Sequence, residues 1–211
     1  MHELNKIRDH TVSVLDSISR PAAPYYERYV KAAVFSALDG LRQHPHVQIG
    51  TDRYGNIIAR YRHPGARFDA SLATAAHMDH PGFHIVSVSG DDITASIQGG
   101  LPRDDRLIGS SMHIFRGDRE IRGTIRGFAD ASHDTITVTP ESDPGPVLGN
   151  DYLQERDHAW GVPAVERFRV DGDLIHGRAM DDLAGCAQQI VALQRLVAEA
   201  VPVEFTALFN R

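Results

Sequence analysis

The sequence predicts an α/β fold that is interrupted by an inserted β-rich domain. Helical runs and apolar strands occupy both ends of the 211-residue chain, whereas the middle contains short alternating segments between Gly, Asp and Pro clusters. The two ends must come together for either of them to bury its apolar face. We therefore expect one α/β domain built from residues 1–84 and 169–211, with the β-rich insert at residues 85–168.

Two helices and three strands are expected in the first part of the α/β domain. Apolar residues recur at helical spacing over residues 4–18 and 30–41, and prolines separate the two runs. The period then changes, which predicts strands at residues 47–49 and 56–61 with a turn between them. The apolar run at residues 70–77 indicates a buried strand that is covered on both faces.

The insert is expected to be a small antiparallel β-unit or barrel, because its segments alternate and turn residues separate them. Its strands are predicted at residues 83–88, 93–97, 111–115, 120–125 and 135–139. A weak helix signal lies around residues 151–156.

The last part of the chain predicts a short strand at residues 174–176, a long helix, and a final apolar strand at residues 203–209. The helix begins at Asp182, which is a plausible N-cap. Its apolar face comprises Cys186, Ile190, Leu193 and Val197. A thiol on this face is expected to lie in the core rather than to act as a nucleophile.

Charge and composition exclude several classes of partner. The net charge is −6, with 22 basic and 28 acidic residues, so no broad basic field exists to bind nucleic acid. No apolar run approaches the ~20 residues that span a bilayer, and charged residues occupy the position of a signal peptide's apolar stretch. The single cysteine cannot form an internal disulfide, which suits a cytoplasmic location. We expect neither nucleic acid nor a membrane as a partner.

The first candidate site is the His77-x-Asp79 pair at the end of a strand. Side chains alternate along an extended chain, so His77 and Asp79 point to the same side. Imidazole suits Zn²⁺ or Co²⁺, and a carboxylate two residues on can accept the ring's other N–H and fix its tautomer. A solvated polar strand end is the alternative interpretation of this short pattern.

The second candidate site is the pair Asp181 and Asp182 at a strand-to-helix junction. Adjacent carboxylates repel each other, so they need a stabilising positive charge. A helix N-terminus offers a partial one and a bound cation offers far more. In the alternative interpretation, Asp182 caps the helix and Asp181 is solvated.

In combination, these motifs resemble the co-catalytic metallo-aminopeptidases typified by the tetrahedral and glutamyl aminopeptidases. The motifs, in order, are Asp52-Arg53-Tyr54-Gly55-Asn56-Ile57-Ile58-Ala59, Ala76-His77-Met78-Asp79 and Met180-Asp181-Asp182-Leu183-Ala184-Gly185-Cys186. Pro24-Tyr25-Tyr26-Glu27 resembles that family's helix start, and residues 97–101, 108–110 and 121–125 resemble its β-rich insert. The resemblance implies a zinc-peptidase-like α/β/α sandwich with a mixed sheet, interrupted by a barrel-like domain.

The resemblance also implies roles for these residues. His77 would ligate one metal ion, Asp79 would orient and polarise that site as a catalytic residue, and Asp181 would bridge both ions. Asp182 would support them, after the unusual cis peptide bond that the family has there. The cofactors would be two divalent metal ions, zinc or cobalt, with manganese as a further candidate. The implied activity is hydrolysis of N-terminal residues from peptides through a metal-activated water, by a dimer-based homo-oligomer in full-length form.

Three departures from the family accompany this resemblance. His80-Pro81-Gly82 replaces Glu-Ile-Gly after the histidine motif, and Leu183 replaces an arginine after the aspartate pair. The chain stops at Arg211, where the family's strand delivers a Glu-Glu pair that supplies the general base and a ligand. We therefore expect an N-terminal portion, through truncation, a frameshift or an incomplete gene, which binds metal weakly and hydrolyses nothing efficiently.

Two other functions stay open at this point. Related amidohydrolases of the carboxypeptidase and deacylase type share the His-x-Asp motif and the bridging Asp. They place their inserted domain after the Glu-Glu strand, so the earlier insert here favours the aminopeptidase. The other alternative is a non-catalytic oligomerisation scaffold on a degenerate peptidase frame, which the changes at His80 and Leu183 would allow.

Overall fold

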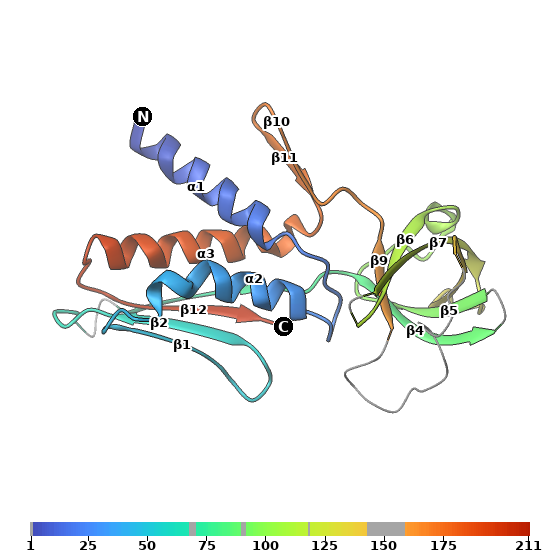
Figure 1. Ribbon diagram of the computed structural model, residues 1–211, viewed down its shortest axis with the longest axis horizontal. Coiled ribbons are helices and arrows are strands. Elements are labelled where there is room, and N and C mark those ends of the chain that lie inside the picture. Colours follow the sequence, from blue (N-terminus) through green and yellow to red (C-terminus); the bar gives the residue numbers. More distant parts are fainter. Residues whose placement is uncertain (1, 68–70, 90–91, 118, 143–158) are drawn as a thin grey trace. The chain divides into compact units, whose positions relative to one another are not determined.

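The computed structural model describes residues 2–67, 71–89, 92–117, 119–142 and 159–211. The chain divides into two compact units (Figure 1): one comprises Met1–Asp79 and Glu166–Arg211, and the other comprises His80–Val165. The domain limits placed after residues 84 and 168 stay a prediction. The weak helix signal around residues 151–156 lies outside the described residues.

The first unit contains a four-stranded mixed sheet. Its strands are β1 (Val47–Thr51), β2 (Ile57–Arg62), β3 (Ser71–His77) and β12 (Glu204–Asn210). They lie in the order β1-β2-β12-β3, with β12 antiparallel to β2 and parallel to β3. The α/β class with a mixed sheet is therefore confirmed.

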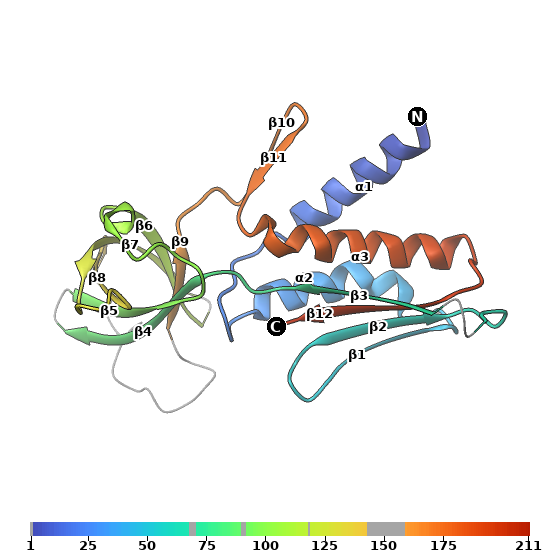
Figure 2. The ribbon, with the colours of Figure 1, turned by 180° about the vertical axis from the view of Figure 1, so that it is seen from behind.

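The described helices are α1 (His2–Ile18), α2 (Arg28–Leu38) and α3 (Met180–Ala198). The helices α2 and α3 lie over one face of this sheet, and α1 packs on α3 and α2 (Figures 1 and 2). A short 3₁₀ helix, η1 (Asp39–Leu41), extends α2. The periodicity of the sequence predicts all three helices, since each turns an apolar stripe toward the core that they share with the sheet. The stripes include Val14, Leu15 and Ile18 from α1, Val30, Val34 and Leu38 from α2, and Cys186, Ile190 and Leu193 from α3.

The prediction that the strand at residues 70–77 is covered on both faces is wrong. Most side chains of β3 are exposed; the side chain of Leu72 is 59% exposed, and Ala76 is the buried residue of the strand. Among the described residues, β3 pairs with β12 alone, because it is the last strand of the sheet. A run of small apolar residues predicts a strand, but it does not reveal whether a neighbour covers it.

The second unit is a closed antiparallel barrel, as expected. Its strands are β4 (Gly82–Ser89), β5 (Asp92–Gln98), β6 (Ser111–Arg116), β7 (Arg119–Phe128), β8 (Thr135–Pro140) and β9 (Trp160–Pro163). They close in the order β4-β5-β8-β7-β6-β9 around a core that includes Phe83, Met112, Ile114 and Ile136. A short 3₁₀ helix, η3 (Asp105–Leu107), lies between β5 and β6.

The hairpin of β10 (Phe168–Asp171) and β11 (Leu174–Gly177) belongs to the first unit. Gly172 has φ +58 in its turn, a left-handed conformation that glycine adopts without steric cost. The predicted strand at residues 174–176 is confirmed, and β10 is its partner. No helix in the described ranges combines the length and apolar content needed to cross a bilayer.

Candidate metal centre

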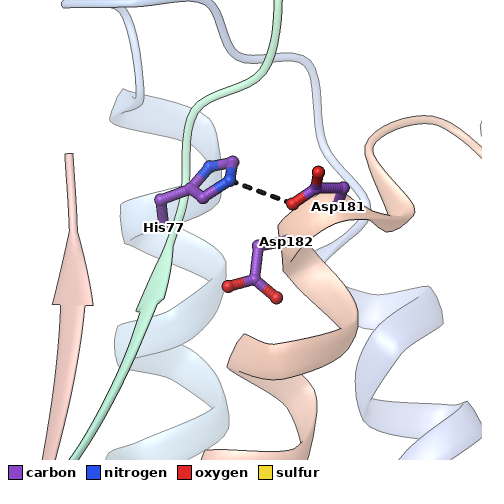
Figure 3. A group of neighbouring side chains, drawn as sticks. All are labelled: His77, Asp181 and Asp182. Carbon is purple, nitrogen blue, oxygen red and sulfur yellow. Dashed lines mark hydrogen bonds and ion pairs between the residues drawn. The ribbon is translucent and has the colours of Figure 1, made fainter.

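The structure brings His77 and the Asp181–Asp182 pair together at one end of the mixed sheet (Figure 3). His77 is the last residue of β3, and the two aspartates lie in the first turn of α3. The Nε2 atom of His77 lies 3.1 Å from Oδ1 of Asp181, although the residues are 104 positions apart. One ligand atom from each of the three residues lies within 4.8 Å of the others. Since zinc binds its ligands at about 2 Å, only small side-chain rotations would bring these atoms onto one ion.

Asp79 holds the other side of the imidazole ring. Nδ1 of His77 lies 2.9 Å from the backbone carbonyl oxygen of Asp79 and 3.3 Å from its carboxylate oxygen Oδ1. A proton on Nδ1 is therefore donated to Asp79, which orients the ring and leaves Nε2 facing Asp181. This is the arrangement that a metal-binding histidine needs, because the ligating nitrogen must carry a free lone pair.

The charges around His77 favour its protonated form. Partial burial alone lowers the pKa of the imidazole. Hydrogen bonding to the Asp79 carbonyl, the charge of Asp79, and the hydrogen bond and charge of Asp181 outweigh this burial and raise the pKa above its ordinary value. A divalent cation at Nε2 would replace the proton that these carboxylates attract.

The helix α3 begins at Met180, two residues before the predicted start, with Ala179 at its N-cap position. Asp182 caps the regular part that follows, as one of the two interpretations predicts. The backbone of Asp182 and that of Asp181 are non-helical, and the peptide bond between them is cis. The Oδ1 atom of Asp182 accepts a hydrogen bond from the backbone N–H of Gly185 at 3.1 Å, which is the pattern of an N-cap side chain. The capping bond uses one oxygen of the carboxylate, so it does not conflict with a role beside His77.

Gly185 allows α3 to approach β3 closely at this point. A Cβ atom at position 185 would collide with the Asp182 carboxylate and would lie 3.1 Å from Cβ of Ala76. The next residue, Cys186, is buried, and its Sγ donates to the carbonyl of His77 at 3.4 Å. Burial, and secondarily the charge of Asp182, raises the pKa of this thiol to about 12. The thiol therefore stays protonated, as expected for a core cysteine.

The centre is open to water. The side chain of His77 is 41% exposed and that of Asp181 is 96% exposed, so their direct ion pair contributes little to stability. An imidazole nitrogen and two carboxylates suit zinc, cobalt or manganese. Among the described residues this group supplies three donors, fewer than the four of a closed tetrahedral site.

The carboxyl end of β12 lies beside this centre. Asn210 is paired with His77 in the parallel register, and the backbone N–H of Met78 donates to the Asn210 carbonyl at 2.7 Å. A second group of charged residues, centred on Glu27 and Arg211, surrounds the same strand end. The sequence pattern alone predicts no role for this group, although Glu27 and the Asp52–Asn56 turn both lie within motifs of the family resemblance.

Comparisons with known proteins place the fold near a group of peptidases. The sequence matches no family model and no curated protein sequence. Among solved structures, an aminopeptidase from the archaeon Desulfurococcus kamchatkensis matches with a TM-score of 0.72 at 19% identity, over 96% of this chain and 56% of that chain. The TET1 peptidase of Pyrococcus horikoshii matches with a TM-score of 0.70 at 18% identity, over 94% of this chain and 60% of that chain.

A structure from Thermotoga maritima that carries the name endoglucanase also matches, with a TM-score of 0.66 at 20% identity, over 95% of this chain and 58% of that chain. The chain thus spans 56–60% of the length of these three structures. At these identities the similarity shows the fold. The activity must be argued from the residues of the site.

Proposed function

We propose that this chain forms the metal-binding part of a metal-dependent aminopeptidase that removes N-terminal residues from peptides. The observation that carries the proposal is the 3.1 Å approach of His77 Nε2 to the Asp181 carboxylate, at the edge of the sheet where β3 ends. Two of the matching structures are named aminopeptidase or peptidase, which supports this function over the endoglucanase name of the third.

The donor set fits a divalent cation, and each residue has a distinct role. His77 would offer Nε2 as a ligand, and Asp79 would keep the Nδ1 proton in place and so fix the ring. Asp181 would supply a carboxylate that two ions could share, with Asp182 supporting it from the start of α3. Two bound ions would supply a water of lowered pKa and a polarised substrate carbonyl.

The same residues predict that the 211-residue chain binds metal weakly. Three donors leave positions around each ion to water, and the group found among the described residues, His77, Asp181 and Asp182, contains no carboxylate beyond these proposed ligands that could serve as a general base. We propose that the whole enzyme is a homo-oligomer that acts on peptides. The TET1 peptidase of Pyrococcus horikoshii can assemble into a tetrahedron or a large octahedral shell, which supports an oligomeric form.

Titration with Co²⁺, followed by its visible absorption bands, tests the site. The chain should bind Co²⁺, and Asp181→Asn or His77→Ala should weaken binding at least about tenfold, because each removes a ligand. Asp104→Asn, which alters a carboxylate paired with Arg106 in the barrel unit, is the matched control and should bind as the wild type does. If Asp181→Asn retains the wild-type affinity, the proposed metal centre is wrong.

Activity is tested with aminoacyl-anilide and N-acyl amino acid substrates. Slow turnover of the aminoacyl-anilide alone supports an aminopeptidase, whereas turnover of the N-acyl substrate would identify an amidohydrolase of the deacylase type. Equal background rates for wild type and Asp181→Asn with both substrates, together with metal-independent self-association in sedimentation, would identify a scaffold instead.

A further inference from the structure

Glu27 is a buried carboxylate that is not among the proposed metal ligands. Its side chain is 2% exposed, and although it directly precedes α2 it makes no capping hydrogen bond to that helix. Instead, Oε1 accepts a hydrogen bond from the backbone N–H of Tyr25 at 2.8 Å, and Oε2 lies 3.3 Å from Nε of Arg211. Burying a carboxylate is costly unless positive charges and hydrogen bonds compensate it, and these two contacts, with the nearby charge of Lys31, supply such compensation for Glu27.

Arg211, which follows β12, has a partner at each of its three guanidinium nitrogens, with Glu27 at Nε. Nη1 donates to the carbonyl of Tyr54 and Nη2 donates to the carbonyl of Tyr25, each at 3.2 Å. The backbone N–H of Arg211 donates to Oδ1 of Asn56 at 2.9 Å. The end of β12 is therefore tied both to the loop before α2 and to the β1–β2 turn.

The β1–β2 turn is itself rigidly held. Asp52 accepts hydrogen bonds from the backbone N–H groups of Tyr54 and Asn56 and from Nδ2 of Asn56, at 2.8–3.0 Å. Lys31, one turn along α2, packs against the turn so closely that a Cβ on Gly55 would lie 2.7 Å from Nζ. Glu27 and Asp52 thus balance the charges of Arg211 and Lys31 in one cluster.

The conformation of Tyr25 shows how strongly this cluster constrains the backbone. Tyr25 has φ +74, in the left-handed region that non-glycine residues seldom occupy. Its N–H donates to Glu27 and its carbonyl accepts from Arg211, so the two charged side chains hold the peptide groups before and after Tyr25. Loss of the charge of Glu27 or of Arg211 would therefore remove one of the constraints on this loop.

The cluster reaches the metal centre through the β12–β3 pair. Asn210 immediately precedes Arg211 and lies opposite His77, and its carbonyl accepts the Met78 N–H at 2.7 Å. A displacement of the end of β12 would therefore move the backbone on both sides of His77. Because ligand atoms must lie within a few tenths of an ångström of their ideal positions, such a movement would weaken metal binding.

We propose that Glu27 is a positioning residue: through Arg211 it fixes the carboxyl end of β12, and so holds the end of β3 that presents His77 to Asp181. The effect on metal affinity rests on the proposed function, since it requires His77 to be a ligand. The effect on the backbone does not.

Metal affinity gives the first test. Glu27→Gln keeps the shape of the side chain but removes its charge, and it should weaken Co²⁺ binding about tenfold. Glu199→Gln is the matched control, because it makes the same change at the exposed pair with Arg195 in the same unit and should leave affinity unchanged. Val34→Ala destabilises α2 from its buried face without touching the cluster, and it should also leave affinity unchanged. Wild-type affinity in Glu27→Gln, or an equal loss in Val34→Ala, overturns the proposal.

Amide hydrogen exchange gives a test that needs no metal. Glu27→Gln should accelerate exchange of the Met78 N–H more than that of the His63 N–H, which donates to the Val203 carbonyl at the opposite end of the sheet. Equal acceleration at both amides would show a general loss of stability and would also overturn the proposal.

If the wild-type chain binds no Co²⁺, the proposed function fails while the exchange result still decides the role of Glu27. Arg211→Gln removes the same ion pair from its more exposed side, so it replaces Glu27→Gln if that variant does not fold.

Discussion

At the scale of single residues, His77 is the side chain whose protonation the site controls. Asp79 lies against Nδ1 and Asp181 lies against Nε2, so both ring nitrogens face an acceptor. In the absence of metal this arrangement favours the imidazolium form. Metal binding and protonation therefore compete for the same nitrogen.

The first prediction concerns the titration of His77. In metal-free protein its pKa should lie above the ordinary value of about 6.5, and Asp181→Asn should lower the pKa because it removes one of the raising charges. The stability that this histidine contributes is then fully present below its ordinary pKa and is lost as the pH rises through the raised value. The chemical shift of the ring Cε1 proton, followed by NMR against pH, measures the pKa of His77 in the wild type and in Asp181→Asn. A pKa that Asp181→Asn leaves unchanged would contradict this assignment of causes.

Sequence patterns identified part of this site and left part of it hidden. The residue types of His77 and Asp181 leave their roles open; the resemblance of the ordered motifs to a metallo-aminopeptidase family is what predicts that the two side chains converge. The role of Glu27 could not be predicted, because its partner Arg211 reaches it only through the register of β12 against β2. The burial of a carboxylate such as Glu27 is hard to predict from a sequence when the cation that pairs with it is distant along the chain.

At the scale of elements, the contact of α3 with β3 depends on Gly185. We predict that Gly185→Ala destabilises the first unit by about 1–3 kcal/mol, because a methyl group would force apart the Asp182 carboxylate and the strand at Ala76. The cost should exceed the roughly 1 kcal/mol that alanine gains over glycine in a helix. Urea unfolding measures the difference. Gly50→Ala, where a Cβ meets nothing within 4 Å, is the control, and equal stability of the two variants would disprove the close contact.

The elements that the sequence predicted are those with a clear period. The three helices carry apolar stripes over three or more turns, and five barrel strands alternate between turn residues. The strand β9 is not predicted because its four residues include both glycine and proline. The strand β10 is not predicted either, although its equally short partner β11 is. The strands β9 and β10 form because they pair with adjacent strands, β9 with β4 and β6 and β10 with β11, and not because their own residues show a clear alternation.

At the scale of the whole molecule, the residues that the structure describes form two hydrophobic cores, one in each unit. We predict that Ile114→Ala, in the barrel core, lowers the stability of the barrel by about 2–5 kcal/mol and leaves the first unit largely unchanged. Hydrogen exchange should then accelerate at the Ile97 N–H, which donates to Asp134, but not at the Met78 N–H. Ile57→Ala, in the other core, should give the reverse pattern. Matched acceleration at both amides in either variant would show that the units unfold together.

The position of β3 at the end of the sheet order has a consequence for the purified protein. Within the described ranges this strand bonds to β12 on one side alone, and residues 71–77 contain no Asp, Glu, Lys, Arg or Pro. Natural proteins use such residues to prevent a bare row of peptide groups from recruiting strands of other molecules. Concentrated solutions should therefore form intermolecular sheets that scatter light, and Ala73→Lys, on an exposed position of this strand, should suppress the scattering. Scattering that is the same in both proteins would place the cause of the self-association elsewhere.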